Sequence, residues 1–87
     1  MLIALDYDGT YTKDPALWDA FIANAVDRGH RVFCVTMRYP TEPIQMPCDV
    51  IYTGRKAKAV HAQTVHQMAF DIWIDDRPEF ILLGAGT

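Results

Sequence analysis

The N-terminal stretch Leu2-Ile3-Ala4-Leu5-Asp6-Tyr7-Asp8-Gly9-Thr10 is the most informative part of the sequence for the fold class. A four-residue apolar run of this kind is typical of a strand that is buried on both faces. Gly9 then allows the chain to turn at once. Because residues two apart in an extended chain face the same side, we expect the carboxylates of Asp6 and Asp8 to point together. The stretch therefore predicts a buried strand that ends in a pair of acids.

The same pattern of a short apolar run ending in a polar residue recurs along the chain. The further runs are Val32–Val35 before Thr36, Val50–Tyr52 before Thr53, and Ile72–Ile74 before Asp75. Each run predicts another strand with both faces buried. A last apolar run, Phe80–Leu83, predicts an additional strand at the edge of the sheet.

A strong helix signal separates the first two predicted strands. Asp14 is a suitable N-cap, Pro15 suits the first helical position, and Gly29 suits the residue beyond the end. The apolar residues fall on one face at a spacing of 3.6, and this predicted inner face consists of Leu17, Trp18, Phe21, Ile22, Ala25 and Val26. We therefore expect a helix that packs on the sheet.

A weaker helix signal covers about residues 56–68. Its predicted inner stripe consists of Ala57, Val60, Thr64, Val65 and Met68. Between Thr36 and Asp49 the chain carries three prolines, Pro40, Pro43 and Pro47, and we expect a loop there.

The alternation of strands and helices predicts an α/β fold. We expect a minimal Rossmann-like parallel sheet of four to five strands, with about one helix on each face, in a single domain over residues 1–87. Ligands bind to such sheets outside the carboxyl ends of the strands. Residues that are far apart in the sequence are therefore expected to meet in one crevice.

Composition limits the classes of function. Of the 87 residues 51% are apolar and the net charge is −3, which is normal for a folded globule and shows no polybasic nucleic-acid tract. The opening apolar run is too short for a signal sequence, and no run approaches the ~20 residues of a membrane span. Cys34 and Cys48 lack metal-binding spacing. We expect a soluble cytoplasmic protein that contacts no membrane, and the small size makes a homo-oligomer plausible.

Two acidic pairs indicate the chemistry. Asp6 with Asp8, and Asp75 with Asp76, each follow a predicted strand, and paired carboxylates attract a hard cation such as Mg²⁺. Thr36 adds a hydroxyl, and Lys58 adds a positive charge from the second helix. Carboxylates, metal, hydroxyl and ammonium together are suited to phosphoryl transfer.

The order Asp-x-Asp-Gly-Thr, Thr, Lys and Asp-Asp resembles the four motifs of the haloacid dehalogenase (HAD) superfamily. The resemblance covers essentially the whole chain, and residues 73–79 are similar to the same segment of small members that lack a cap domain. It implies a Mg²⁺-dependent phosphomonoester hydrolase in which Asp6 becomes a phosphoaspartate. The implied roles are acid and base for Asp8, phosphoryl binding for Thr36 and Lys58, and metal binding for Asp6, Asp75, Asp76 and the backbone carbonyl of Asp8. Lys56 is the alternative to Lys58.

This chain departs from the family by having no room for a cap domain. Only residues 11–13 separate the first motif from the helix signal, and twenty-one residues lie between Thr36 and Lys58. We therefore expect an open site whose mouth is rimmed by the arginines that follow three strand ends, Arg38, Arg55 and Arg77.

Other functions remain open from the residues alone. A receiver domain gathers similar groups, but along its chain the acidic pair comes first, the phosphoacceptor aspartate second and the lysine last. In this chain Lys58 precedes the acidic pair Asp75-Asp76, so the order of the motifs excludes a receiver domain. A catalytically idle binding protein of the same fold, and a phosphotransferase that uses the same intermediate, are alternatives. The phosphorylated substrate stays undefined: nucleotides, sugar phosphates, phosphoproteins and nucleic-acid ends all fit.

Overall fold

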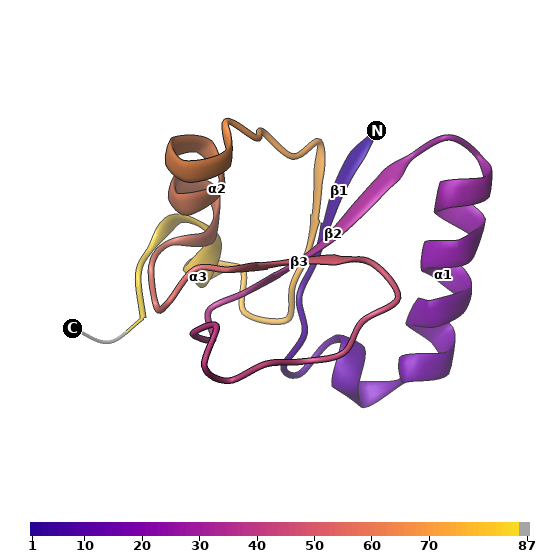
Figure 1. Cartoon of the computed structure of the whole chain (residues 1–87), viewed down its shortest axis with the longest axis horizontal. Coiled ribbons are helices and arrows are strands. Elements are labelled where there is room, and N and C mark those ends of the chain that lie inside the picture. Colours follow the sequence, from indigo (N-terminus) through magenta and orange to yellow (C-terminus); the bar gives the residue numbers. More distant parts are fainter. Residues whose placement is uncertain (86–87) are drawn as a thin grey trace.

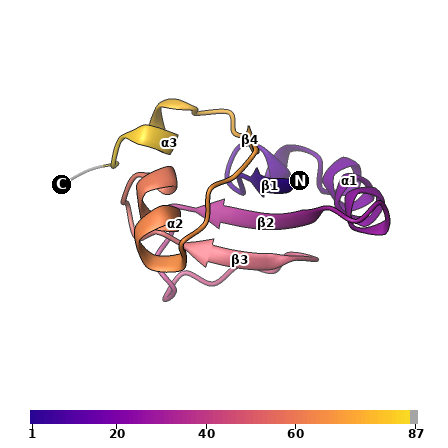
Figure 2. The ribbon, with the colours of Figure 1, turned by 90° about the horizontal axis from the view of Figure 1, so that it is seen from above.

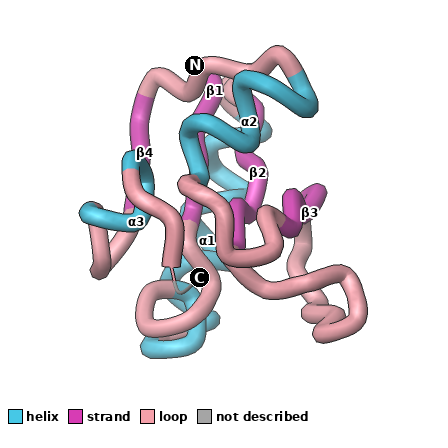
Figure 3. The backbone as a smooth tube through the Cα atoms, turned by 90° about the vertical axis from the view of Figure 1, so that its left-hand side faces the viewer, coloured by secondary structure: helices cyan, strands magenta, loops and turns pink. Residues whose placement is uncertain are grey.

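Four parallel strands form the centre of the structure, a computed structural model in which residues 1–85 are described. The strands are β1 (Leu2–Leu5), β2 (Arg31–Thr36), β3 (Asp49–Tyr52) and β4 (Ile72–Ile74). Their order across the sheet is β3-β2-β1-β4, as Figure 3 shows. The predicted α/β class, the parallel sheet and these four strands are confirmed.

The register of the sheet brings the ends of its strands to one edge. Leu5 pairs with Cys34 of β2 on one side and with Ile74 of β4 on the other. The backbone N–H of Asp6 also donates to the carbonyl of Ile74, at 2.9 Å. The residues that follow β1 and β4 are therefore held side by side.

Helix α1 (Pro15–Asp27) follows a short 3₁₀ helix, η1 (Tyr11–Lys13), and is confirmed with its predicted cap. The Asp14 carboxylate accepts a hydrogen bond from the backbone N–H of Leu17, at 3.2 Å. Ile22 and Ala25 are buried against β1 and β2.

The predicted inner face of α1 is too wide. Trp18 and Phe21 pack at the margin of the core, whereas Leu17 and Val26 are more than half exposed. The core on this side is formed by Ile3, Leu5 and Val32 of the two central strands. The helix needs only a narrow apolar stripe to cover so small a surface.

Helix α2 (Lys58–His66) lies on the other side of the strands, together with α3 (Glu79–Leu82) (Figure 1). The buried residues of α2 are Lys58 and Ala62, while Val60 and Val65 are each 54% exposed. The predicted inner stripe is therefore wrong for Val60, Thr64 and Val65, which are exposed. Met68 does pack on the sheet, but it lies beyond the end of the helix. A pattern of apolar residues treats lysine as outward-facing, but here the lysine is the residue that enters the protein.

The second face of the sheet is covered mainly by the segment after α2. Met68 and Phe70 pack on Ala4, Phe33, Val35 and Ile51, with Trp73 of β4 beside them. Phe70 stacks edge-on against Trp73, with ring centroids 5.0 Å apart.

The predicted fifth strand at residues 80–83 is wrong, because these residues belong largely to α3. Periodicity does not distinguish a strand from a helix in so short an apolar run, and Pro78 adopts helical backbone angles just before it. Among the described residues β4 is therefore an edge strand, and its Ile72 is 39% exposed. Burial of strands on both faces holds for β1 and β2 only.

The helices described here are short. Within residues 1–85, no helix combines the length and apolar character required to cross a membrane.

Candidate functional site

A pocket of about 380 Å³ opens at the carboxyl edge of the sheet. Figure 2 shows the arrows of β2 and β3 ending beside α2, and residues at or just after these strand ends, such as Thr36 and Arg55, line the pocket. Its lining includes all six residues expected from the sequence, namely Asp6, Asp8, Thr36, Lys58, Asp75 and Asp76. The structure thus brings together groups from four separate segments of the chain.

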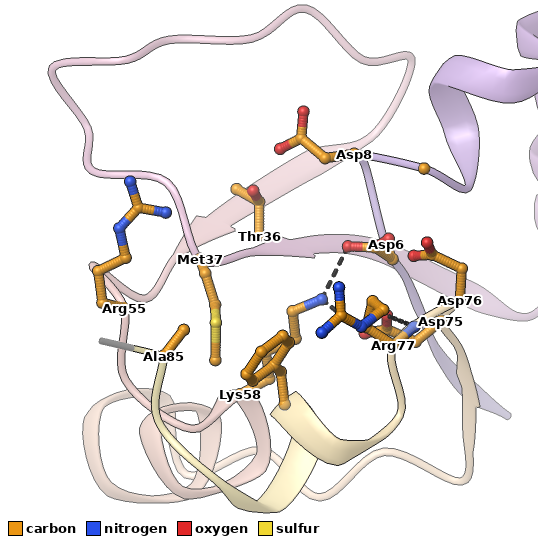
Figure 4. A pocket seen from close by; sticks show the side chains of 12 residues that line it. Asp6, Asp8, Thr36, Met37, Arg55, Lys58, Asp75, Asp76, Arg77 and Ala85 are labelled. Carbon is orange, nitrogen blue, oxygen red and sulfur yellow. Dashed lines mark hydrogen bonds and ion pairs between the residues drawn. The ribbon is translucent and has the colours of Figure 1, made fainter. Parts of the chain in front are cut away.

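Lys58 lies at the centre of the pocket floor (Figure 4). Its Nζ donates to Asp6 Oδ1 at 2.7 Å and to Asp75 Oδ2 at 2.5 Å. The side chains of all three are less than a tenth exposed. Lys56, the alternative lysine, is exposed and does not line the pocket. The buried positive charge of the pocket is therefore the ammonium group of the first residue of α2.

Thr10 is a site residue that was not assigned a role from the sequence. Its hydroxyl lies 3.0 Å from Asp6 Oδ2 and 3.3 Å from Asp76 Oδ1, and its oxygen accepts from the backbone N–H of Asp76 at 3.2 Å. Thr10 thereby joins the loop after β1 to the loop after β4. Its place directly after the Gly9 turn was the signal that could have identified it.

Gly9 allows Asp76 to approach the first loop. Gly9 has a φ of +83°, and a Cβ at this position would lie 2.4 Å from Asp76 Oδ2. Any other residue would therefore combine backbone strain with displacement of this carboxylate. The glycine and Thr10 together fix the orientation of Asp76.

Three carboxylates are arranged so that they could hold a metal ion. Oxygen atoms of Asp6, Asp75 and Asp76 all lie within 4.8 Å of one another. The donor set contains only oxygen, which suits a hard cation. The carboxylate of Asp8 is not part of this group. The metal-binding role that the resemblance implies for Asp8 uses its backbone carbonyl oxygen instead.

The charges of the pocket floor are not balanced. Two buried carboxylates share one ammonium group, and Asp76 adds a further negative charge. Burial raises the pKa of Asp6 to about 6, although the hydrogen bond from Lys58 opposes this rise. Burial alone would lower the pKa of Lys58, but the hydrogen bonds and charges of Asp6 and Asp75 raise it. Lys58 therefore stays charged, and an additional cation would favour the ionised form of Asp6.

Asp8 has a different partner from Asp6. Its two oxygens accept from Arg38 Nε at 3.0 Å and from Arg38 Nη2 at 2.9 Å, and its side chain is 56% exposed. The chain turns at Tyr7, so the alternation expected of an extended strand ends before Asp8. The hydrogen bonds from Arg38 lower the pKa of Asp8. The two carboxylates line one pocket but are bound by different cations.

Thr36 ends β2 at the wall of the pocket and is buried. Its hydroxyl oxygen accepts from the backbone N–H of Arg38 at 3.3 Å. The hydroxyl hydrogen therefore stays available to an oxygen atom in the pocket.

The three arginines expected at the mouth differ in their surroundings. Arg55 and Arg77 line the pocket, whereas Arg38 lies beside it on Asp8. Arg77 Nε pairs with Glu79 Oε2 at 2.8 Å, and its guanidinium lies over the ring of Phe80. The backbone N–H of Arg77 donates to Asp75 Oδ1 at 2.9 Å, which fixes the second oxygen of that carboxylate.

Comparisons of the chain with family models, with curated proteins and with solved structures found no match.

Proposed function

We propose that this protein is a Mg²⁺-dependent phosphatase of the HAD type, which hydrolyses phosphomonoesters through an aspartyl phosphate on Asp6. The observation that carries the proposal is the buried Asp6–Lys58–Asp75 group at the open edge of a parallel sheet. Lys58 positions one oxygen of Asp6, and Thr10 positions the other. A carboxylate held in this way is oriented for attack on phosphorus.

The pocket supports the binding of a phosphoryl group as well. The Thr36 hydroxyl and the Lys58 ammonium approach the space in front of Asp6 from β2 and α2. Both groups donate hydrogen bonds to oxygen, and the lysine also offsets the negative charge that gathers on the phosphoryl oxygens.

The proposed reaction has two steps. In the first, an Asp6 oxygen bonds to phosphorus while the bond from phosphorus to the ester oxygen breaks, and Asp8 donates a proton to the leaving oxygen. In the second, Asp8 takes a proton from water, whose oxygen attacks phosphorus and releases inorganic phosphate and free Asp6. Arg38 must move off Asp8 for the first proton transfer, because the ion pair stabilises the carboxylate form.

Asp6, Asp75 and Asp76 would hold the Mg²⁺. When bound, the ion would supply positive charge that draws the anionic substrate towards Asp6. The unbalanced charge of the three carboxylates and the oxygen-only donor set both favour this assignment.

The test is hydrolysis of an aryl phosphate by the purified chain with Mg²⁺ and with excess chelator. We expect turnover with Mg²⁺ only, and none for Asp6→Asn. Asp19→Asn is the matched control, because Asp19 lies on α1 and binds Tyr11 outside the pocket. Full turnover in Asp6→Asn would disprove the nucleophile assignment.

One observation favours a second candidate, the idle binding protein. Both oxygens of Asp8 are occupied by Arg38, as expected of a site that binds an oxyanion without turning it over. Such a protein would bind orthovanadate in the presence of Mg²⁺ but release no phosphate from any ester.

A further inference from the structure

The basic side chains around the pocket are not equivalent. Lys58, Arg38 and Arg77 each bind a carboxylate of the protein. Within residues 1–85, Arg55 is the pocket-lining cation that forms no such ion pair. Its guanidinium group therefore keeps its fork of N–H donors for an anion that enters from outside.

The backbone of Arg55 is held in an unfavourable conformation. Its φ of +70° lies in the left-handed region, which a long side chain rarely adopts. Its N–H donates to the Met37 carbonyl at 2.9 Å, and its carbonyl accepts from the N–H of Ala85 at 2.8 Å. Strain of this kind persists only where the surrounding structure imposes it, and it is common in ligand-binding segments. The two hydrogen bonds fix the direction in which the side chain leaves the loop.

Tyr39 restricts the same side chain. The guanidinium carbon of Arg55 lies 5.8 Å from the centre of the Tyr39 ring. The ring itself packs on the backbone of Gly54, where an added Cβ would come within 3.0 Å of it. An arginine that stacks on a ring loses less conformational freedom when it binds a phosphate. In Figure 4, Arg55 stands on the far side of Thr36 from Asp75.

We propose that Arg55, positioned by Tyr39, is a second phosphate subsite, and that the preferred substrate carries another phosphate on its leaving group. This inference rests on the proposed function, because the transferred phosphoryl group is taken to lie between Asp6, Thr36 and Lys58. The second phosphate then lies beyond Thr36, against Arg55. A pocket of about 380 Å³ is large enough for such a small bisphosphate. The same chemistry is offered by the first phosphodiester of a phosphorylated nucleic-acid end.

The test compares substrates that differ in one phosphate only. Phosphate release is measured with the Mg²⁺-loaded chain for adenosine 5′-monophosphate and adenosine 3′,5′-bisphosphate. We expect the wild type to prefer the bisphosphate at least tenfold in kcat/KM. Arg55→Gln is expected to reduce this preference to about threefold or less, because a charge-assisted contact is lost. Arg28→Gln is the control, since Arg28 caps the far end of α1, and it should keep the wild-type preference.

A third substrate, a 5′-phosphorylated dinucleotide, distinguishes the two sources of the second phosphate. Turnover equal to that of the bisphosphate assigns the subsite to a phosphodiester. Much weaker turnover assigns it to a free phosphate group. An equal preference in the wild type and in Arg55→Gln would overturn the subsite while leaving the hydrolase intact.

Two further measurements separate the possible failures. If no ester is turned over, calorimetric binding of the two adenosine ligands in the presence of Mg²⁺ still tests the subsite. Tenfold tighter binding of the bisphosphate to the wild type, and loss of this difference in Arg55→Gln, would support the subsite. Equal binding of the two ligands to the wild type would overturn it.

The second measurement is thermal stability. Arg55→Gly should melt at the wild-type temperature or above, because glycine adopts positive φ freely. A marked loss of stability in this variant would make Arg55 a structural residue and would overturn the proposal.

Discussion

Helices α1 and α2 lie on opposite sides of the sheet and are held there by different forces. Helix α1 buries Ile22 and Ala25 against apolar strands. Helix α2 buries the ammonium group of Lys58 between two carboxylates and exposes the valines that would form an apolar face. A helix beside a charged pocket is thus attached through its charge, and its stability depends on the state of the pocket.

Removing the cation of α2 should have the largest effect. Lys58→Met leaves the buried carboxylates of Asp6 and Asp75 without their cation, and loss of one member of a buried ion pair costs about 3–5 kcal/mol. We expect the free energy of unfolding, measured with urea in excess chelator, to fall by about this amount. Millimolar Mg²⁺ should restore part of the loss, because the proposed ion would bind the folded state and would neutralise the same carboxylates.

The matched control for this variant is Lys56→Met, two residues earlier in the chain. Lys56 is exposed and forms no ion pair with the described residues. Its replacement should change the free energy of unfolding by no more than about 0.5 kcal/mol. Equal effects in the two variants would mean that Lys58 is not the residue that docks α2.

A core truncation in α1 should have the next largest effect. Ile22 is 2% exposed, and Ile22→Ala is expected to cost roughly 2–4 kcal/mol through lost burial and a residual cavity. The loss should be the same with and without Mg²⁺, since the pocket is not involved. Val26→Ala, on the exposed side of the same helix, should cost far less. A Mg²⁺-dependent loss in Ile22→Ala would show that the two sides of the sheet are coupled.

The elements that follow local rules could be predicted from the sequence. The four strands were found from apolar runs, and α1 was found from Asp14, Pro15 and its apolar spacing. The face of α2 could not be found in this way, because burial of Lys58 depends on partners 17 and 52 residues away. The apolar run at residues 80–83 is too short for its spacing to distinguish a strand from a helix. It forms a helix that begins directly after Pro78, whose backbone angles are helical.

The members of the site were predictable to a greater extent than their pairings. Parallel strands bring their carboxyl ends to one edge, so the convergence of Asp6, Thr36 and Asp75 followed from the fold class. The fold class did not predict that Asp6 pairs with Lys58 while Asp8 pairs with Arg38, because this difference depends on the turn at Tyr7. Hydrogen bonds from Thr10 likewise require knowing how two loops meet.

The helix caps offer a smaller contrast. Asp14 caps α1, whereas Ala57 at the start of α2 provides no side-chain hydrogen bond. Asp14→Ala should lower the free energy of unfolding by about 1 kcal/mol, and Asp14→Asn should keep most of the stability because asparagine also caps well. Thermal and urea unfolding both report this change. Equal losses in the two variants would show that the charge of Asp14, not its hydrogen bond to Leu17, is what matters.

The smallest expected effect tests the orientation of α2 directly. An apolar reading of this helix places Val60 inside, where replacement by a polar residue would cost well over 1 kcal/mol. The structure leaves Val60 54% exposed and buries Ala62 completely. Val60→Gln should therefore change the free energy of unfolding by less than about 0.5 kcal/mol, with a slight gain because glutamine favours helices more than valine does. Ala62→Gln, two positions along, should be strongly destabilising. If Val60→Gln lost more stability than Ala62→Gln, Val60 and not Ala62 would face the sheet. Lys58 lies on the same face of α2 as Ala62, so it could then no longer reach Asp6 and Asp75.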